Sequence, residues 1–315
     1  MNTSSKDRFR GALLGLATGD AVGTVVEFKP RGSFAPVTDM VGGGPFNLKP
    51  GQFTDDTSMA LCLGQSLLDR QGFDPVDQLT KYVRWWREGY MSSTGRCFDI
   101  GTTTCAALRR FEKTGEPYCG STDPHQAGNG SIMRLAPVPM FYFNDPAQAL
   151  EKCGLSSKTT HGAPTVVDAC RYLGALLVGA LIGESKEKLL SAHYSPVLGY
   201  WEMNPLCPEI DEIAGGSFLR KLEKEINSSG FVVHTLEAAL WAFANSDSFC
   251  EGCLKTVNLG GDADSVAAVY GQLADAWHGA DGVPEKWRNK LAMRETIEDI
   301  AEGLYKSAPS APVPE

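Results

Sequence analysis

The sequence predicts an all-α protein folded as one compact multi-helix domain. Apolar residues recur at helical spacing through most of the chain, and alternating strand-like runs are scarce. The one short strand candidate is 231–233, between a glycine and a helical pattern. No repeat, charge run or linker divides residues 1–306, so a single domain is the simplest interpretation. Residues 307–315 consist mostly of serine, alanine and proline, which predicts a disordered C-terminal tail.

The helices can be assigned in order from this spacing. The first covers 9–21 and carries Gly11, Gly15 and Gly19 at four-residue intervals. Glycine lowers helix propensity, so this ridge indicates close approach to a neighbouring helix. Residues 29–52 are rich in Gly and Pro and predict a long loop, typical of a lid or binding loop. Further helices are expected over 56–70, 76–88, 100–113, 146–156, 164–183, 185–192, 209–226, 235–245, 247–257, 265–278 and 284–304, the last of them broken.

The composition is that of an ordinary globular protein with ample residues for a core. Of the 315 residues, 43% are hydrophobic and 21% are charged, and the formal net charge is −9. No dense run of Lys or Arg is present, which argues against nucleic-acid binding except as a modified substrate. The polar start lacks a signal-peptide core, and the most apolar stretch, 174–183, is too short to span a membrane. The nine cysteines have no regular spacing, which fits reduced thiols. We therefore expect a cytoplasmic monomer without a membrane partner.

Two stretches near opposite ends of the chain combine clustered carboxylates with hydroxyls at a helix start. In the second, Asp262 and Asp264 follow a Gly-Gly pair and precede Ser265. Asp264 is well placed to cap the helix that follows. Capping needs only one aspartate, so Asp262 requires another explanation. The alternative is a doubly acidic helix start favoured by the helix dipole.

The first stretch, 53–59, repeats this design with Thr54, Asp55 and Asp56. Like charges repel, so two such acid pairs facing each other would be unfavourable without a cation between them. Mg²⁺ and Mn²⁺ prefer oxygen ligands, which clustered carboxylates and hydroxyls provide. The two stretches therefore predict a centre for two divalent ions, provided that they meet in space.

Three further segments have candidate roles, each with an alternative. Asp99 precedes Gly101 and three threonines at a helix start, where it either belongs to a site or caps the helix. The amides of the Gly-Asn-Gly turn at 128–130 could hold a phosphate, although such a sequence is also a common tight turn. His161 lies in a loop before a helix and is either a ligand-binding residue or simply exposed.

The order of these motifs resembles the ADP-ribosylglycohydrolase family, close to the bacterial branch that includes the dinitrogenase reductase-activating glycohydrolase. The resemblance extends from about Arg8 to Leu304 and rests chiefly on FTDDTSM and GGDADS. Supporting motifs are GALLGLATGDAVG, CFDIGTTT and GNGSIMRLAPV. One departure is Ser265, where the family more often has threonine, although the hydroxyl is kept.

The resemblance implies an all-α fold around two Mg²⁺ or Mn²⁺ ions. The metal ligands it implies are Thr54, Asp55 and Asp56 on one side and Asp262, Asp264 and Ser265 on the other. Catalytic roles are implied for Glu27, Asp55, Asp99 and Asp264, with Asp99 assisting proton transfer and Glu27 lying over the site. Substrate binding is implied for Gly101, for Gly128, Asn129, Gly130 and Ser131 at the diphosphate, and for His161 near the distal ribose.

The activity that the resemblance implies is hydrolysis of the bond from C1″ of ADP-ribose to an acceptor, commonly an arginine guanidinium on a protein. Two metal ions could hold the 2″ and 3″ hydroxyls and acidify a water. A carboxylate such as Asp99 or Glu27 would carry protons to and from the leaving group. The partner would be an ADP-ribosylated protein or another ADP-ribose conjugate. One alternative is an O-linked (serine or ester), nucleic-acid-linked or small-molecule conjugate as substrate; another is a non-catalytic, crystallin-like structural member.

Overall fold

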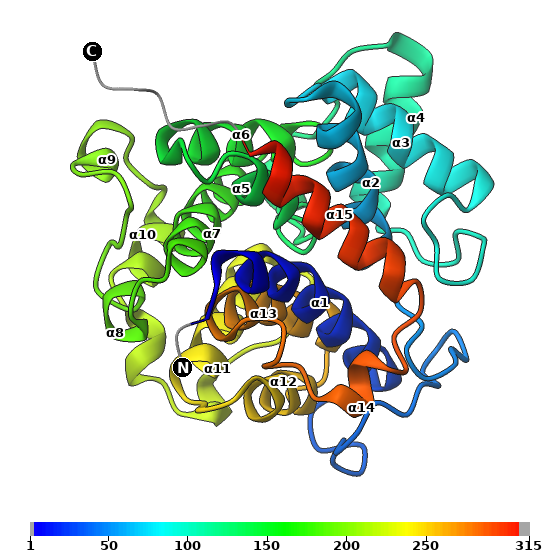
Figure 1. The fold of residues 1–315 in the computed structure, drawn as a ribbon, viewed down its shortest axis with the longest axis vertical. Helices are drawn as coiled ribbons and strands as arrows, with labels where there is room; N and C mark the ends of the chain where they lie inside the picture. The colour runs from blue at the N-terminus through cyan, green and yellow to red at the C-terminus, as the bar shows by residue number, and fades with distance from the viewer. Residues whose placement is uncertain (1–2, 309–315) are drawn as a thin grey trace.

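The computed structural model describes residues 3–308, and within them the fold is entirely helical apart from isolated β-bridges. Figure 1 shows the helices gathered around a central pair, α1 and α13. The helices are α1 Ser5–Gly23, α2 Asp55–Arg70, α3 Pro75–Glu88, α4 Thr102–Thr114, α5 Pro137–Phe141, α6 Pro146–Lys158, α7 Pro164–Ile182, α8 Lys186–Leu189, α9 Tyr200–Met203, α10 Pro208–Ala214, α11 Val232–Ala244, α12 Phe249–Asn258, α13 Ala263–His278, α14 Glu285–Arg288 and α15 Arg294–Ser307. The predicted all-α class is confirmed for this part of the chain.

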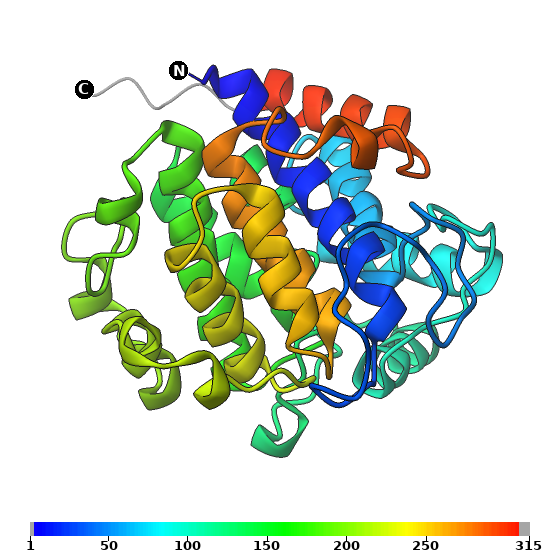
Figure 2. The same cartoon turned by 90° about the horizontal axis from the view of Figure 1, so that it is seen from below.

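The glycine ridge of α1 lies directly against the backbone of α13, as predicted. A Cβ atom added to Gly11, Gly15 or Gly19 would lie 2.1–2.2 Å from the carbonyl oxygen of a residue in α13. These contacts run in opposite directions along the two helices, which are therefore antiparallel (Figures 1 and 2). The C-terminal end of α1, with Gly23, thus lies beside the first turn of α13, with Asp264. The close packing of these two helices brings the acidic start of α13 next to the end of α1.

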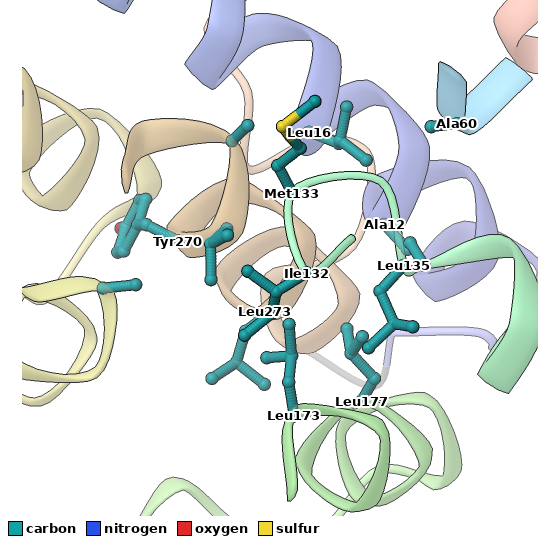
Figure 3. Packing of buried hydrophobic residues seen from close by; sticks show 14 of the residues in the cluster. Ala12, Leu16, Ala60, Ile132, Met133, Leu135, Leu173, Leu177, Tyr270 and Leu273 are labelled. Carbon is teal, nitrogen blue, oxygen red and sulfur yellow. The ribbon is translucent and has the colours of Figure 1, made fainter. Parts of the chain in front are cut away.

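A non-helical segment crosses the core between α13 and α7. Figure 3 shows Ile132 and Leu135 of this segment with Leu273 of α13 and Leu177 of α7. Because this segment is not helical, its backbone groups need other hydrogen-bond partners, and the buried side chain of Gln272 provides them. Its amide nitrogen donates to the Ile132 and Met133 carbonyls at 3.2 and 2.8 Å, and its amide oxygen accepts from the Ala136 N–H at 2.7 Å. This one side chain secures the route of the chain directly after the predicted glycine turn.

The helix α7 has the length and apolar composition of a membrane span, although the apolar stretch identified in the sequence is shorter. Within the fold, 78% of its most apolar window is buried inside the protein. The helices α6, α11 and α13 pack against it. In this structure α7 therefore has the surroundings of a core helix.

Several boundaries differ from the predicted ones. The helix expected over 209–226 is wrong as a single unit: α10 ends at Ala214, and Gly216, with φ +89°, turns the chain into two 3₁₀ helices, Ser217–Arg220 and Glu223–Glu225. The short helices α5 and α9 were not predicted, and only the first half of the helix expected over 185–192 forms α8. The strand candidate is also wrong, because α11 begins at Val232 and only Phe231 forms an isolated bridge, with Gly128.

The predictions for the C-terminal part are largely consistent with the structure. The expected break within 284–304 separates α14 from α15, and Met293, in the left-handed region with φ +53°, precedes the second helix. The predicted tail begins one residue too early, because Ser307 is the last residue of α15. From residue 309 onward, the tail lies outside the described residues.

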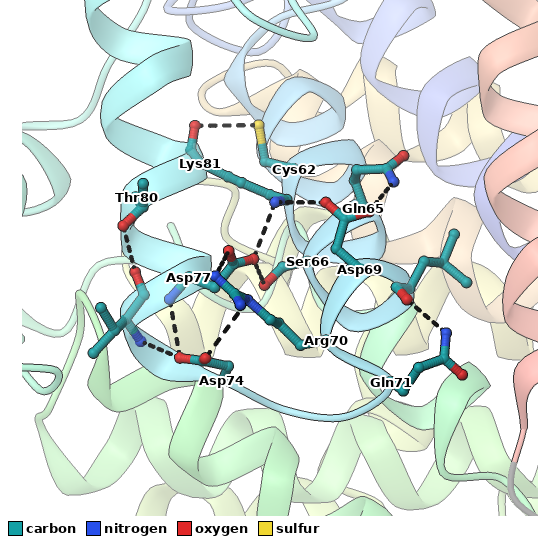
Figure 4. Close-up of polar contacts among 12 residues, drawn as sticks. Cys62, Gln65, Ser66, Asp69, Arg70, Gln71, Asp74, Asp77, Thr80 and Lys81 are labelled. Carbon is teal, nitrogen blue, oxygen red and sulfur yellow. Dashed lines mark hydrogen bonds and ion pairs between the residues drawn. The ribbon is translucent and has the colours of Figure 1, made fainter.

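An ion-pair network joins the end of α2 to α3 (Figure 4). The Lys81 ammonium lies 2.8 Å from Asp69 and 3.0 Å from Asp77, and Arg70 lies 3.0 Å from the second oxygen of Asp77. Ser66 also donates to Asp77 at 2.7 Å. Although burial acts to raise it, these hydrogen bonds hold the pKa of Asp77 below its usual value. The carboxylates at this end of α2 are therefore neutralised by the protein's own cations.

Candidate active site

The two acidic stretches meet at the start of α2 and α13. The Thr54 hydroxyl lies 3.4 Å from a carboxylate oxygen of Asp264, and the Ser265 hydroxyl lies 3.5 Å from one of Asp56. Residues from opposite ends of the sequence thus share one polar cluster. The prediction that the two stretches come together is confirmed.

The capping role predicted for Asp264 is wrong. The helix α13 begins at Ala263, so Asp264 is its second residue and Asp262 occupies the N-cap position. The side chain of Asp262 makes no capping hydrogen bond and instead accepts one from the Asn129 amide at 2.7 Å. Gly260 and Gly261 both have positive φ, and the helix that follows them starts two residues earlier than expected. Neither aspartate is therefore used to cap the helix.

Asp20, to which no role was assigned from the sequence, organises the first acidic stretch. Its carboxylate accepts hydrogen bonds from the backbone N–H and hydroxyl of Thr54, at 2.9 and 3.0 Å, and from those of Thr57, at 3.0 and 2.6 Å. It thereby caps α2 from the end of α1, because Thr54 itself makes no side-chain capping bond. The available signal was an aspartate inside an apolar, glycine-rich helix, where a buried charge needs partners.

A cavity of about 260 Å³ opens over this cluster. Its walls include, from the predicted site, Glu27, Asp55, Asp99, Gly101, Gly128, Asn129, Gly130, His161, Asp262, Asp264 and Ser265. Three predicted residues do not line it: Thr54 and Asp56 lie buried beneath it, and the Ser131 side chain is also buried, with its hydroxyl 2.8 Å from that of Ser157. The predicted site residues thus surround or support a single cavity.

The glycine turn has backbone donors available at Gly130 and Ser131. Among the described residues, neither backbone N–H has a hydrogen-bond partner. The N–H of Asn129 is already bonded to the Gly230 carbonyl at 3.0 Å, and its side-chain amide bonds Asp262 and Thr235. Gly128, which lines the cavity, likewise has no partner for its N–H among the described residues. Within the predicted diphosphate turn, the amides that can receive a ligand are therefore those of Gly128, Gly130 and Ser131, whereas Asn129 orients the acidic stretch.

Comparison with known proteins agrees with this arrangement. The family model for ADP-ribosylglycohydrolase matches residues 1–312. The chain belongs to the ADP-ribosylglycohydrolase family. The ADP-ribosylarginine hydrolase Tri1 of Serratia proteamaculans is 44% identical to it, over 98% of this chain and 81% of the relative. The ADP-ribosyl-[dinitrogen reductase] glycohydrolase of Rhodospirillum rubrum is 34% identical, over 92% of each chain.

A solved structure described as an ADP-ribosylglycohydrolase-related protein complex superposes with a TM-score of 0.85 at 44% identity. The match covers 97% of this chain and 99% of that one. The protein is therefore an enzyme of the glycohydrolase class, and the fold described above is the family fold.

Within residues 3–308, the site carboxylates of this ADP-ribosylglycohydrolase have no cationic partner. Among residues 3–308, no Lys, Arg or His forms an ion pair with the site acids, which are Asp20, Glu27, Asp55, Asp56, Asp99, Asp262 and Asp264. One buried oxygen of each of Glu27, Asp56 and Asp264 also lacks a hydrogen-bond donor. Buried, unpaired carboxylates of this kind are suited to a metal ion.

Burial and mutual repulsion shift the acids strongly. Burial, with the nearby Asp99 and Asp262 carboxylates, raises the pKa of Glu27 to about 9. Burial, with Asp20 and Asp262, raises the pKa of Asp99 to about 7. Burial also raises the pKa of Asp264 well above its usual value. In the protein alone, the cluster therefore holds protons that a divalent cation would displace.

Two alternatives from the sequence are excluded by the geometry. Asp99 does not cap α4, because that helix starts at Thr102 with Gly101 at the N-cap position and no side-chain capping bond. His161 is not an exposed loop residue, since it is only 2% exposed and lines the cavity. Burial, together with the nearby Arg134 cation, lowers the pKa of His161 to about 3, so the imidazole is neutral at physiological pH.

Proposed function

We propose that the protein is a metal-dependent hydrolase that cleaves the N-glycosidic bond between C1″ of ADP-ribose and the guanidinium of an ADP-ribosylated arginine, most often on a protein. The observation that carries this proposal is the cavity in which buried carboxylates from three parts of the chain converge without a basic partner. The names of the Serratia and Pseudomonas relatives, both ADP-ribosylarginine hydrolases at 44–45% identity, support the arginine linkage.

The donor set fits a pair of hard divalent cations, Mg²⁺ or Mn²⁺. Oxygens of Asp20, Asp56 and Asp264 lie within 4.8 Å of one another, and so do oxygens of Glu27, Asp99 and Asp264. Asp264 belongs to both groups, so its carboxylate would be able to hold a cation together with the acids of either one. We assign the ions to Thr54, Asp55, Asp56, Asp262, Asp264 and Ser265. Asp20 fixes the start of α2, which carries the first three of these, through its hydrogen bonds with Thr54 and Thr57. When bound, such ions supply charge stabilisation and lower the pKa of a water.

The chain's own residues bind the conjugate and move its protons. The free amides of Gly130 and Ser131 are placed to bind phosphate oxygens in an acidic protein that offers no basic side chain there. Asp99 lines the cavity with a carboxylate that can take a proton from the attacking water or give one to the leaving guanidine nitrogen. Glu27 lies over the same cluster, where it faces Asp99 and Asp264.

The test is a release assay with a defined panel of substrates. The protein is stripped with EDTA, returned to Mg²⁺, Mn²⁺ or no metal, and given ADP-ribose linked to arginine, to serine, to a terminal carboxylate or to a nucleic-acid end. We expect release of free ADP-ribose from the arginine conjugate alone and only with metal. Isothermal titration should give about two metal ions per chain, as expected for a two-metal site.

Three results would contradict the proposal. Equal release in EDTA and in metal would remove the metal dependence. Release from the serine, ester or nucleic-acid conjugate with none from arginine would move the activity to a different linkage. Absence of release from every conjugate would favour the structural, crystallin-like alternative.

A further inference from the structure

Arg134 is a fully buried cation that has no carboxylate partner among the described residues. Its guanidinium stacks 4.5 Å from the ring centre of Tyr82 and contacts the sulfur of Met59 at 3.5 Å. Its one hydrogen bond to oxygen goes from Nη2 to the Thr160 hydroxyl, at 2.5 Å. Burying a charge is unfavourable unless hydrogen bonds or other favourable contacts offset its desolvation, so the few contacts of Arg134 indicate where it acts. The contact with Thr160 leads furthest.

Thr160 links this guanidinium to the imidazole of His161. The Thr160 hydroxyl oxygen lies 2.8 Å from His161 Nδ1 and is itself fully buried. Arginine has only donors, so Thr160 must be the acceptor in its bond with Arg134. The hydroxyl has one hydrogen left to donate, and His161 Nδ1 is the only acceptor that the described residues bring to it. If Nδ1 carried the proton instead, this buried hydroxyl hydrogen would have no partner.

The opposite nitrogen of the ring, Nε2, lies beside the glycine turn that borders the ligand cavity. A Cβ atom added to Gly130 would lie 3.0 Å from His161 Nε2 and 2.7 Å from Cε1, and one added to Gly128 would lie 3.6 Å from Nε2. The imidazole edge therefore occupies the space that these two glycines leave open beside the predicted diphosphate turn. His161 is among the residues that line the cavity.

The backbone of His161 is held by a second chain of hydrogen bonds. Its N–H donates to the Ser157 carbonyl at 2.7 Å, and its carbonyl accepts from the Ser157 hydroxyl at 2.9 Å. Because Ser157 has given its one hydrogen to His161, the contact at 2.8 Å between the two serine hydroxyls must be donated by Ser131. Ser131 therefore supports His161 with its side chain while its backbone N–H remains available.

We propose that Arg134 and Thr160 are positioning residues that hold neutral His161 as its Nε2–H tautomer, so that the ring presents one hydrogen-bond donor to a ligand oxygen in the cavity. The relay orients the imidazole without giving it a charge. In this state Nε2 can neither bind a metal ion nor accept a proton, and His161 serves as a donor to a phosphate or ribose-hydroxyl oxygen. That choice of ligand rests on the proposed function, whereas the tautomer follows from the hydrogen-bond pattern alone.

The tautomer can be measured directly in the ligand-free protein. With the five histidines labelled with ¹⁵N, long-range proton–nitrogen correlation spectra distinguish a protonated Nε2 from a protonated Nδ1. His161→Gln assigns the signal by removing it. We expect His161 to be neutral at pH 7 and protonated at Nε2. A protonated Nδ1, or rapid exchange between both tautomers, would overturn the relay whatever the enzyme hydrolyses.

The matched variants are Thr160→Val, which keeps the shape and removes the hydroxyl, and Thr160→Ser, which keeps the hydroxyl. In Thr160→Val we expect a mixture of tautomers, about tenfold weaker binding of free ADP-ribose and a raised KM with kcat little changed, as for the loss of one oriented hydrogen bond. Thr160→Ser should restore both the spectrum and the affinity. Wild-type binding by Thr160→Val, or weakened binding by Thr160→Ser with an unchanged spectrum, would contradict the inference.

The same measurements separate this inference from the proposed function. An Nε2–H signal in a protein that binds no ADP-ribose would leave the relay standing and reject the ligand. Hydrolysis of the arginine conjugate by a protein with a protonated Nδ1 would keep the function and reject the relay. If Thr160→Val fails to fold, the wild-type spectrum and Thr160→Ser still decide the question.

Discussion

Asp55 and Asp56 begin α2, whereas Asp69, near its C-terminal end, pairs with Lys81 of the neighbouring α3. Both ends of this helix bring carboxylates together, and both bury some of them. At the C-terminal end, Lys81 and Arg70 supply positive charge and lower the pKa of the acids around them (Figure 4). At the N-terminal end the same fold supplies hydroxyls and further acids, and the pKa of each carboxylate rises.

The difference separates structural acids from acids arranged for a ligand. A protein that can place Lys81 against Asp77 could equally have placed a cation against Asp55, yet the described residues around the cavity offer none. The raised pKa values at the N-terminal end mean that, in the protein alone, protons rather than basic side chains neutralise the acids there. Substitutions at each end of α2 and around the cavity can test whether paired and unpaired acids differ in this respect.

The largest effect is expected from Asp264→Asn, because this residue belongs to both groups of clustered oxygens. The variant should lose turnover on the arginine conjugate by roughly 10³-fold or more, as expected when metal-centred charge stabilisation is removed. It should still fold, since Asn fits the same space at the second position of α13. Release assays, metal titration and circular dichroism on one preparation provide the check. Turnover within tenfold of wild type would show that the unpaired end is not the catalytic centre.

Asp99→Asn should reduce kcat by roughly 10²–10⁴-fold, the range typical of a general acid–base group. Metal affinity should remain close to wild type because the proposed ligands do not include Asp99, although its oxygens lie near those of Asp264. The melting temperature should also change little, because among the described residues Asp99 neither caps α4 nor pairs with a cation. Stopped assays at saturating substrate and metal titration measure the two quantities separately. An unchanged kcat would retire the catalytic role, and loss of metal binding would instead make Asp99 a ligand.

Some features of the fold and the site could be predicted from the sequence, and others could not. The acidic stretches and the glycine ridge of α1 were predictable because each is a local pattern with a physical purpose. The role of Asp20 was not predictable, because its partners, Thr54 and Thr57, are contributed by another helix. The orientation of Ser131 toward Ser157 likewise depends on a tertiary contact.

The predicted helix boundaries were wrong where one or two glycines set the backbone conformation. Gly260 and Gly261 have positive φ angles, and the N-cap position of α13 falls at Asp262 instead of the predicted Asp264. Near Gly216, α10 ends, although the periodicity of the sequence predicted a helix as far as residue 226. The spacing of apolar residues indicates which side chains face inward, but it does not indicate where a glycine adopts a left-handed conformation.

The same substitution at the two ends of α2 should change stability in opposite directions. In EDTA at pH 7.5, Asp55→Asn should raise the melting temperature by a few degrees, because it removes one member of a repelling cluster. Asp77→Asn should lower it, at a cost of about 1–3 kcal/mol, because it breaks bonds with Lys81, Arg70 and Ser66. Adding Mg²⁺ should stabilise the wild type and Asp77→Asn, but stabilise Asp55→Asn much less. Destabilisation by both substitutions in EDTA would contradict the distinction between the ends.

The smallest effect is the pH dependence of the free energy of unfolding without metal. In the folded protein the pKa is about 7 for Asp99 and about 9 for Glu27, whereas an unfolded carboxyl has a pKa of about 4. The folded state therefore binds more protons between these values, and its stability must fall as the pH rises through them. The loss should be on the order of 1 kcal/mol per pH unit for each retained proton.

Urea unfolding in EDTA between pH 6.5 and 8 isolates this effect. The depressed pKa of Asp77 gives the opposite sign, because its stabilisation is lost only as the pH falls through the acid range, so the paired end of α2 contributes no slope in this window. The pKa of His161 is lowered to about 3 in the folded protein, so this residue contributes a slope of the opposite sign near its unfolded pKa of about 6.5, and that contribution fades about one pH unit higher. Glu27→Gln should reduce the slope, Asp77→Asn should preserve it, and saturating Mg²⁺ should abolish it by replacing the protons. A slope that survives in Mg²⁺ would mean that the protons lost on unfolding belong to some other part of the protein.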